Sequence, residues 1–230
     1  MFSGISPEAM WLLADNRFRD SKTFYEEHKL EIRRQVIEPM RELLAEVAPV
    51  VQEIDPEILA NPGRNNSISR VRRDNRYSRD KSMYRENMWV VWARDKNVWE
   101  NAPGFYIDFS LRGAEYGMGF YSAPPRLMKG IREALLAAPD CFLEAAGAAA
   151  DAGFIVEGDR YARPKLEGLP PLLDDIANRK SLTFLRREPD PAFFGDSLLT
   201  GTLKEGFLAL APIYRLLLQC SIGFSQAAEA

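Results

Sequence analysis

Hydrophobic positions three and four residues apart predict helices in the first quarter of the chain. Ser6-Pro7-Glu8 has the features of a helix start, because serine can cap, proline suits the first turn and glutamate opposes the positive end of a helix. We expect this first helix to run to about Asn16.

A second helical pattern begins at Asp20 or Ser21 and carries a single apolar stripe. Its members recur at steps of three and four: Phe24, His28, Ile32, Val36, Met40, Leu43, Val47, Val50 and Ile54. Pro39 and Pro49 interrupt the pattern, and a proline inside a helix removes a hydrogen bond, so we expect a kinked helix or two consecutive ones. Asn61-Pro62-Gly63 should end the helical region.

The middle of the chain changes to a period of two, which is typical of half-buried strands. Apolar Phe105, Ile107, Phe109 and Leu111 alternate with Tyr106, Asp108 and Ser110. Candidate partner strands lie at 67–73, 88–93 and 116–121, and their short links favour antiparallel pairing. Gly117 and Gly119 in the last of them allow a bulge or a close backbone contact.

After Pro124-Pro125 the helical period returns. Its apolar positions are Leu127, Ile131 and Leu135, then the alanine-rich stretch 142–152, then Leu199, Leu203, Phe207, Leu210, Tyr214 and Leu217. The last helix should be entered from Asp196-Ser197 and bent at Pro212. Helices, then strands, then helices predict an α+β fold in which N-terminal and C-terminal helices flank a central antiparallel sheet. We expect a single domain over residues 1–230, helical at 1–60, sheet-rich at 64–122 and helical at 124–220.

Composition places the chain among ordinary globular proteins, with 46% apolar and 27% charged residues. Its start lacks the basic and apolar regions of a secretory signal, and no apolar run approaches the ~20 residues that cross a bilayer. We therefore expect a cytoplasmic protein with no membrane contact. Cys141 and Cys220 should be reduced thiols that fill the core.

Several classes of chemistry are excluded by what the sequence lacks. His28 is the single histidine and lies on an apolar stripe, so we expect it in the core or at its boundary rather than in a catalytic triad. One histidine and two distant cysteines cannot supply a zinc site, and no phosphate-binding loop, dinucleotide-binding glycine motif or Gly-x-Ser-x-Gly occurs. No metal site is predicted and no cofactor is assigned. Asp74, Asp80 and Asp108 are carboxylates that a hard cation would accept, but ion pairing or solvation is their commoner fate.

Eight basic residues lie between positions 64 and 85, with two acids, in a chain whose net charge is −3. Such a segment either binds a negative partner or forms an ionic network of its own. Three interpretations stay open. The arginines pair with Asp74, Asp80 and nearby helices, or they hold a small anion, or they line a nucleic-acid groove with Tyr77 and Tyr84 as stacking platforms.

Our leading functional prediction is a site for a small phosphorylated or carboxylated ligand, made by Arg70, Arg73, Arg76, Lys81 and Tyr84. Trp89 and Trp92 would add an apolar wall, and Asp74 and Asp80 should support the site through charge-assisted hydrogen bonds that fix the turn. Single-stranded nucleic acid is an alternative partner, which the acidic chain as a whole disfavours. A further alternative is a hydrolase or transferase for a phosphate-bearing substrate that uses neither histidine nor a phosphate loop. Enzymatic activity and oligomeric state are left unassigned.

The same run resembles the signature of an uncharacterised family, domain of unknown function 2461. The family pattern is Arg-x-x-Arg-Asp-x-Arg-Phe-Ser-x-Asp-Lys-x-Pro-Tyr-Lys, and these positions fit it directly: Arg70, Arg73, Asp74, Arg76, Ser78, Asp80, Lys81 and Tyr84. Tyr77 stands in place of phenylalanine, Arg85 in place of lysine, and Met83 in place of the usual proline. Weaker matches extend over most of the chain, at 2–4, 117–119 and 127–132. The resemblance implies an α+β fold in a bacterial cytoplasm or its fungal equivalent, and it implies no activity.

Overall fold

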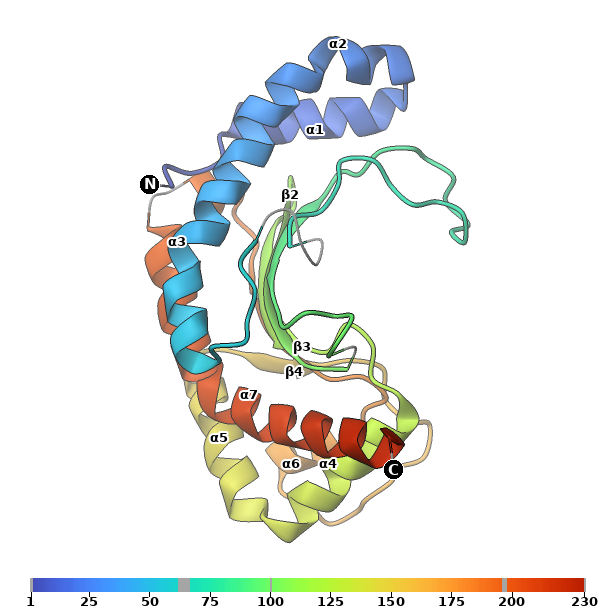
Figure 1. Ribbon diagram of the computed structural model, residues 1–230, viewed down its shortest axis with the longest axis vertical. Helices are drawn as coiled ribbons and strands as arrows, with labels where there is room; N and C mark the ends of the chain where they lie inside the picture. The colour runs from blue at the N-terminus through green and yellow to red at the C-terminus, as the bar shows by residue number, and fades with distance from the viewer. Residues whose placement is uncertain (1, 62–66, 100, 196–197, 230) are drawn as a thin grey trace.

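The computed structural model describes residues 2–61, 67–99, 101–195 and 198–229, which form an α+β fold (Figure 1). Its centre is a five-stranded sheet in which neighbouring strands are antiparallel. The strands, in spatial order, are β1 (Met88–Trp92), β2 (Gly104–Ser110), β3 (Gly113–Gly119), β5 (Thr183–Glu188) and β4 (Ile155–Glu157). Helices from both ends of the chain flank this sheet, so the predicted fold class is confirmed.

Two capped helices begin the N-terminal part. α1 (Pro7–Arg19) is capped by Ser6, whose Oγ accepts a hydrogen bond from the Ala9 amide at 3.2 Å, as the sequence predicts. α2 (Lys22–Ile32) is capped in the same way by Ser21. Asp20 between them has a left-handed backbone with φ of 45°, which lets the chain turn sharply from one helix into the next.

α2 continues into α3 (Glu38–Ile54) through one π-helical turn at Arg33–Ile37. Pro39 has no amide hydrogen to donate, and the turn before it is widened, with the Glu38 amide bonded to the Arg33 carbonyl. The predicted interruption at Pro39 is thus confirmed as a π turn, whereas α3 continues through Pro49. Pro62-Gly63, predicted to close the helical region, lies outside the described residues.

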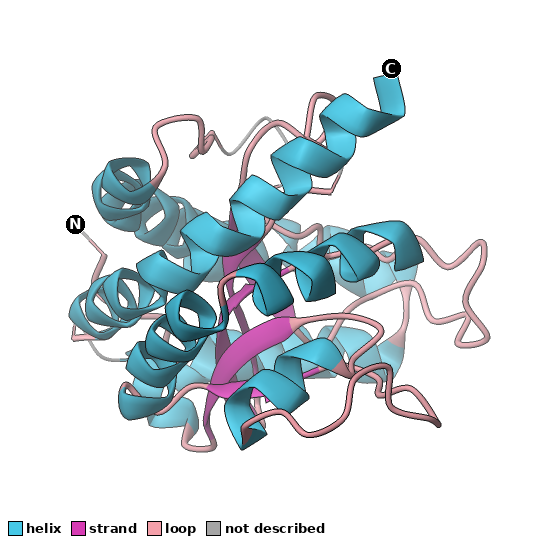
Figure 2. Cartoon of the chain, turned by 90° about the horizontal axis from the view of Figure 1, so that it is seen from below, coloured by secondary structure: helices cyan, strands magenta, loops and turns pink. Residues whose placement is uncertain are grey.

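α3 and the last helix, α7 (Leu199–Glu229), cover one face of the sheet. This face carries the buried side chains of alternate strand positions, which on β2 are Phe105, Ile107 and Phe109. Phe105 packs against Phe207 and Tyr214 of α7, with ring centroids 4.9 and 4.8 Å away. In Figure 1 both helices lie on the convex side of the curved sheet, and none of the described helices lies on its concave side. Figure 2 shows the helical layer from below.

Two strands are missing from the sequence prediction. β4 and β5 lie within residues 124–220, so the expectation that this region is helical throughout is wrong. β4 spans three residues, too few to show a period, and the second half of β5 is charged. β5 lies beside β3, where a Cβ on Gly117 would be 1.9 Å from the Phe184 carbonyl oxygen. The predicted close backbone contact at Gly117 is confirmed.

The segment 67–73 is extended, but it is not the predicted regular strand. It meets the edge of β1 through an isolated bridge, with the Ser69 amide 3.0 Å from the Trp89 carbonyl oxygen and the Val91 amide 2.8 Å from that of Ser67. Arg72 pairs instead with Tyr84. Because the segment changes its partner between these two bridges, no continuous ladder forms.

A side chain occupies the opposite edge of the sheet. Arg179 donates from Nη2 to the Val156 carbonyl at 2.6 Å and from Nη1 to the Gly158 carbonyl at 2.7 Å. Asp175 accepts a further bond from Nη2 at 3.0 Å and holds the guanidinium in place. Backbone acceptors that an added strand would use are therefore already bonded.

α7 is the central helix of the core. Its stretch Leu199–Ser225 is long and apolar enough to cross a bilayer by length and composition, which corrects the expectation that no such run exists. Its buried side chains, however, face the sheet and α3; they include Leu203, Phe207, Leu210, Tyr214 and Leu217. α7 is accordingly the core helix of a soluble domain. Its predicted entry, Asp196-Ser197, lies outside the described residues. The remaining described helices are α4 (Pro125–Ala137), α5 (Pro139–Asp151), α6 (Pro171–Ala177) and a 3-10 helix at Pro191–Gly195.

A buried ionic cluster joins the end of α3, the end of β1 and α7. Asp55 accepts hydrogen bonds from Arg94 Nε at 2.7 Å, from Arg94 Nη2 at 2.9 Å and from the Tyr214 hydroxyl at 2.6 Å. Burial opposes the charge on Asp55, but these donors outweigh burial and hold the pKa of Asp55 below its usual range. Burial also raises the pKa of Tyr214, so its hydroxyl stays protonated and donates.

Tyr214→Phe should lower the free energy of unfolding by about 2 kcal/mol, because it removes a hydrogen bond to a buried charged group. Tyr116→Phe is the matched control: Tyr116 is equally buried, but its hydroxyl bonds to no described residue, so the loss should stay below about 1 kcal/mol. Urea denaturation of both variants at neutral pH measures the difference. Equal losses would show that the bond to Asp55 adds nothing to stability.

Candidate functional site

The predicted ligand-binding residues lie in an extended loop, residues 67–85, here termed the arginine segment. Figure 1 shows it projecting from the sheet on the side of α1 and α2. Tyr84 anchors its end: the side chain is 2% exposed, and its ring stacks on Tyr25 of α2 at 4.9 Å. Asp20 accepts hydrogen bonds from the Met83 and Tyr84 amides at 2.7 and 3.3 Å. Tyr84 therefore attaches the segment to the helices, and its ring does not offer the surface contact predicted for a ligand.

Asp80 joins the arginine segment to α1. Its carboxylate accepts hydrogen bonds from the Ser82 amide at 3.0 Å, the Ser82 hydroxyl at 2.7 Å, Arg73, and Arg17 of α1 at 3.0 Å. Ser82 and then Arg73 hold the pKa of Asp80 well below its usual range. Arg73 also donates to Ser78, so this arginine is engaged within the segment.

Asp74 makes the charge-assisted bonds that the sequence predicts, with a residue two positions away. Arg76 donates to it from Nε at 2.9 Å, from Nη2 at 2.7 Å and from its amide at 3.3 Å. These bonds lower the pKa of Asp74. Both side chains are exposed, so the pair shapes the loop without linking it to other elements.

The four predicted cations therefore differ in their bonding. Arg73 and Arg76 bind carboxylates, and Lys81 donates from Nζ to the carbonyls of Asn75 at 3.1 Å and Arg76 at 3.4 Å. Arg70 is exposed, and its side chain bonds to no described residue. Arg73, Arg76 and Lys81 thus bond within the segment, each to a different partner, as the interpretation of an internal ionic network predicts.

Arg85, the last residue of the segment, has a different environment. Its guanidinium lies 4.2 Å from the centroid of the Trp89 ring. Trp89 lies on the face of β1 that α3 and α7 do not cover, here termed the uncovered face of the sheet. The Nε atom is buried, and the side chain forms no hydrogen bond or ion pair with any described residue. Burial, and then the nearby charge of Arg73, lower the pKa of Arg85. Arg85 is thus a partly desolvated cation, and none of its side-chain N–H groups bonds to a described residue.

Trp89 begins a polar row that crosses the uncovered face of the sheet. The strand register places Asp108 opposite Trp89, Glu115 opposite Asp108, and Arg187 opposite Glu115. Arg187 donates to Glu115 at 3.1 Å and to Glu157 of β4 at 2.7 Å. The polar row therefore contains residues from all five strands.

Asp108 forms no ion pair with any described residue. Its Oδ2 accepts a hydrogen bond from Asn87 Nδ2 at 2.7 Å. Burial, with the nearby charge of Glu115, raises the pKa of Asp108 to about 6 against the opposing effects of Asn87 and Arg85. A carboxyl group in this range exchanges protons near neutral pH.

Part of this site can be predicted from the sequence. Alternation along 105–111 already places Tyr106 and Asp108 on one face, and the Tyr106 hydroxyl donates to Glu115 at 2.9 Å. The sequence alone does not show that Asp108 lies near Arg85 or Glu115, because cross-strand neighbours depend on the register of the sheet. Trp92, expected beside Trp89 as an apolar wall, lies in the core instead, since positions three apart on a strand face opposite ways.

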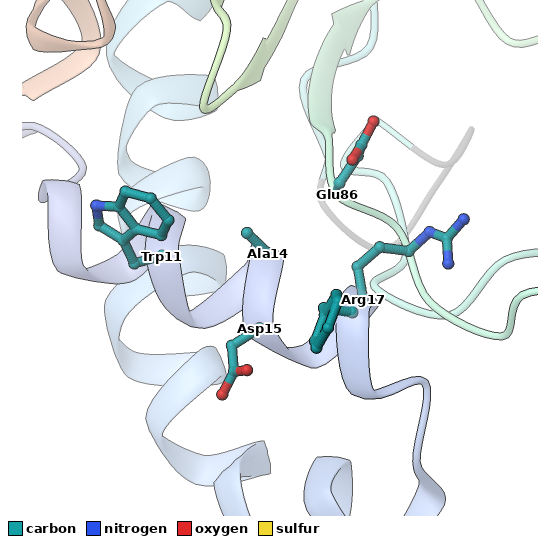
Figure 3. Close-up of a pocket in the computed structure, with 6 residues that line it drawn as sticks. Trp11, Ala14, Asp15, Arg17 and Glu86 are labelled. Atoms are coloured by element: carbon teal, nitrogen blue, oxygen red, sulfur yellow. The ribbon is translucent and has the colours of Figure 1, made fainter.

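A pocket of about 560 Å³ lies between α1 and Glu86 (Figure 3). Two exposed aromatic side chains, Trp11 and Phe18, line it two helical turns apart. Its charged residues are already paired: Asp15 with Arg19, Arg17 with Asp80, and Glu86 with Arg112. The pocket presents aromatic surface rather than free charge, and its lining includes none of the predicted ligand-binding residues.

The other candidate groups add no site. His28 is half-buried, stacks on Phe24 and has Nδ1 2.9 Å from the Phe24 carbonyl oxygen, as expected of a boundary residue. Cys141 and Cys220 are free thiols, but Cys141 is exposed on α5, so the expectation that it fills the core is wrong. Within the described ranges, no group of three or more His, Cys, Asp or Glu side chains could hold a metal ion.

Asp80→Asn should lower the melting temperature more than Asp74→Asn, because only Asp80 of the two bonds to α1. The substitutions remove the same charge from the same segment, so each controls for the other. Scanning calorimetry at pH 7 compares them. The same shift in both variants would contradict a stabilising role for the Asp80 contact with Arg17.

Asp108→Asn should stabilise the protein at pH 7.5 by about 1–2 kcal/mol, after allowance for partial exposure of the side chain. The folded protein holds the Asp108 proton more tightly than the unfolded chain, because the pKa is raised to about 6. Wild-type stability therefore falls as the pH rises from 4 through 6, and the variant lacks this loss. Chemical denaturation at pH 4 and 7.5 checks the sign. If Asp108→Asn raised the free energy of unfolding by the same amount at both pH values, the pKa of Asp108 would not be raised.

Comparison with known families matches residues 8–215 to the family described as Conserved hypothetical protein (DUF2461). No curated protein and no solved structure matches the chain. The matched residues include the whole arginine segment and the polar row, and the family description carries no activity. The chain therefore belongs to the DUF2461 family, and the resemblance seen in its arginine-rich signature is confirmed.

Proposed function

We propose that the protein binds a small molecule carrying a phosphate or carboxylate group, with Arg85 as the residue that receives this group. The observation that carries the proposal is the bonding of Arg85: its Nε is buried, yet the side chain has no hydrogen-bond or ion-pair partner among the described residues. Burying the Nε–H group without a partner is unfavourable, and an anion bound to this guanidinium would offset that cost.

The surroundings of Arg85 favour an anion. The guanidinium carbon of Arg85 lies 4.2 Å from the centroid of the Trp89 ring, and a planar guanidinium can bond two oxygens of one ligand group. The charge of Arg73 is close enough to lower the pKa of Arg85, although Arg73 itself is paired with Asp80. Arg70 adds a further exposed positive charge in the same segment.

Asp108 supplies a second contact for the ligand. It lies directly opposite Trp89 in the sheet, so the ring that supports Arg85 also borders this carboxyl group. A carboxyl group accepts hydrogen bonds from hydroxyl or ammonium groups. The ligand class that fits is a small phosphate or carboxylate that also carries a hydroxyl or amino group.

This proposal narrows the site predicted from the sequence. Arg70 remains as a flanking cation, whereas Arg73, Arg76 and Lys81 act through internal bonds that shape the segment. Tyr84 positions the segment by stacking on Tyr25 of α2. A cytoplasmic location, which two free thiols favour, is part of the proposal.

Single-stranded nucleic acid is the alternative ligand of a different class. One observation favours it: Tyr77 is 95% exposed, with Arg76 5.8 Å from its ring centroid, which suits the stacking of a base. The second predicted platform, Tyr84, is buried, so stacking would depend on one ring of the segment. Strongly salt-dependent binding of a short oligonucleotide, stronger than that of small anions, would favour this alternative.

Arg85→Gln should weaken the binding of inorganic phosphate or citrate by about tenfold or more, because one charge-assisted contact is lost. Isothermal titration calorimetry at low ionic strength measures this change. Arg79→Gln is the matched control, because Arg79 lies in the same segment, is exposed and bonds to no described residue.

The control variant should keep its affinity within about twofold of the wild type. Equal weakening by both variants would indicate general electrostatic attraction, and unchanged binding in Arg85→Gln would remove Arg85 from the site. Melting curves of both variants establish that they are folded.

A further inference from the structure

A second set of unpaired cations lies around Tyr161, outside the site proposed above. Arg132 of α4 has its guanidinium carbon 5.6 Å from the centroid of the Tyr161 ring, and Lys165 has its Nζ 4.8 Å from the same centroid. The ring attracts each cation, but two like charges at one ring repel each other. This arrangement concentrates positive charge on a short stretch of surface.

Acids lie nearby but serve other cations. Asp175 of α6 pairs with both Arg160, at 2.6 Å, and Arg179, at 3.0 Å. The side chains of Arg132 and Lys165, by contrast, form no hydrogen bond or ion pair within the described ranges of the chain, and Nη1 of Arg132 is buried. Arg160 and Arg179 are therefore paired with a carboxylate, whereas Arg132 and Lys165 are paired with none among the described residues.

Asn178 fixes the loop that carries two of the three side chains. It is 2% exposed, and its Oδ1 accepts hydrogen bonds from the Lys165 and Leu166 amides at 2.6 and 3.1 Å. Its Nδ2 donates to the Leu166 carbonyl at 2.9 Å, and its own carbonyl accepts from the Tyr161 amide at 3.1 Å. The loop is held in place before any ligand arrives, which reduces the entropy lost on binding.

We propose that Arg132, Tyr161 and Lys165 form a binding site for a tetrahedral oxyanion, either inorganic phosphate or the phosphate group of a small molecule. The guanidinium and ammonium groups supply charge, and the Tyr161 hydroxyl, which bonds to no described residue, supplies a third donor at the ring edge. Three donors suit inorganic phosphate, which offers four oxygens, or a phosphate monoester, which offers three, better than a carboxylate, which offers two. The site does not depend on the ligand proposed at Arg85.

Nuclear magnetic resonance titration of the isotope-labelled protein with inorganic phosphate tests this site. The amide signals of Tyr161, Lys165 and Leu166 should shift and saturate. Lys165→Gln should weaken the affinity by about tenfold, and it should not disturb the fold, because this exposed side chain forms no hydrogen bond or ion pair with a described residue. Arg132→Gln should have at least the same effect.

Arg163→Gln is the matched control, because Arg163 is exposed in the same loop and the variant loses the same charge. It should keep the affinity within about twofold of the wild type. Acetate at equal ionic strength should bind about tenfold more weakly than phosphate, and equal binding would overturn the tetrahedral class. Arg85→Gln should leave these amide shifts unchanged, which separates the two sites. The absence of saturable shifts, or equal effects of Lys165→Gln and Arg163→Gln, would overturn the proposal.

Discussion

Burial of one face of a single curved sheet is the constraint on which the rest of the structure depends. α3 and α7 supply the apolar layer, and the two-residue period of the strands then sends every second side chain to the uncovered face. Phe105 and Phe109 enter the core for the same reason that Tyr106 and Asp108 stay outside it. The polar row is therefore a product of the pattern that builds the core, and the sheet register aligns its members across five strands.

The bonding of a cation, rather than the local density of arginine, separates structural charge from charge that is available to a ligand. Arg17 and Arg94 each bind a carboxylate and connect distant parts of the chain. Arg85 and Arg132 have buried nitrogen atoms that bond to no residue in the described part of the chain. A guanidinium that is neutralised during folding contributes to the architecture, whereas one that remains uncompensated keeps its capacity to bind an anion.

Periodicity made much of the fold predictable, because it reports burial directly. In the segment 67–73, Arg70 and Arg72 are exposed while Val71 is buried, as an extended chain requires, although no regular ladder forms. Alternation does not report which strand a segment pairs with, and a three-residue strand such as β4 shows no period at all. The site was harder to predict for a related reason. Arg132 reaches Tyr161 from another element, so only the packing of α4 brings them together.

The pairing of β3 with β5 has a consequence for the chain while it is being synthesised. β1, β2 and β3 can pair soon after they leave the ribosome, because their contacts are local. β3 must then wait for β5, which is made after α4, α5, β4 and α6. During this interval β3 is an open sheet edge, and its glycines leave its register weakly specified until β5 arrives. Gly117, which admits the backbone of the correct partner, therefore also leaves the nascent edge open to other backbones.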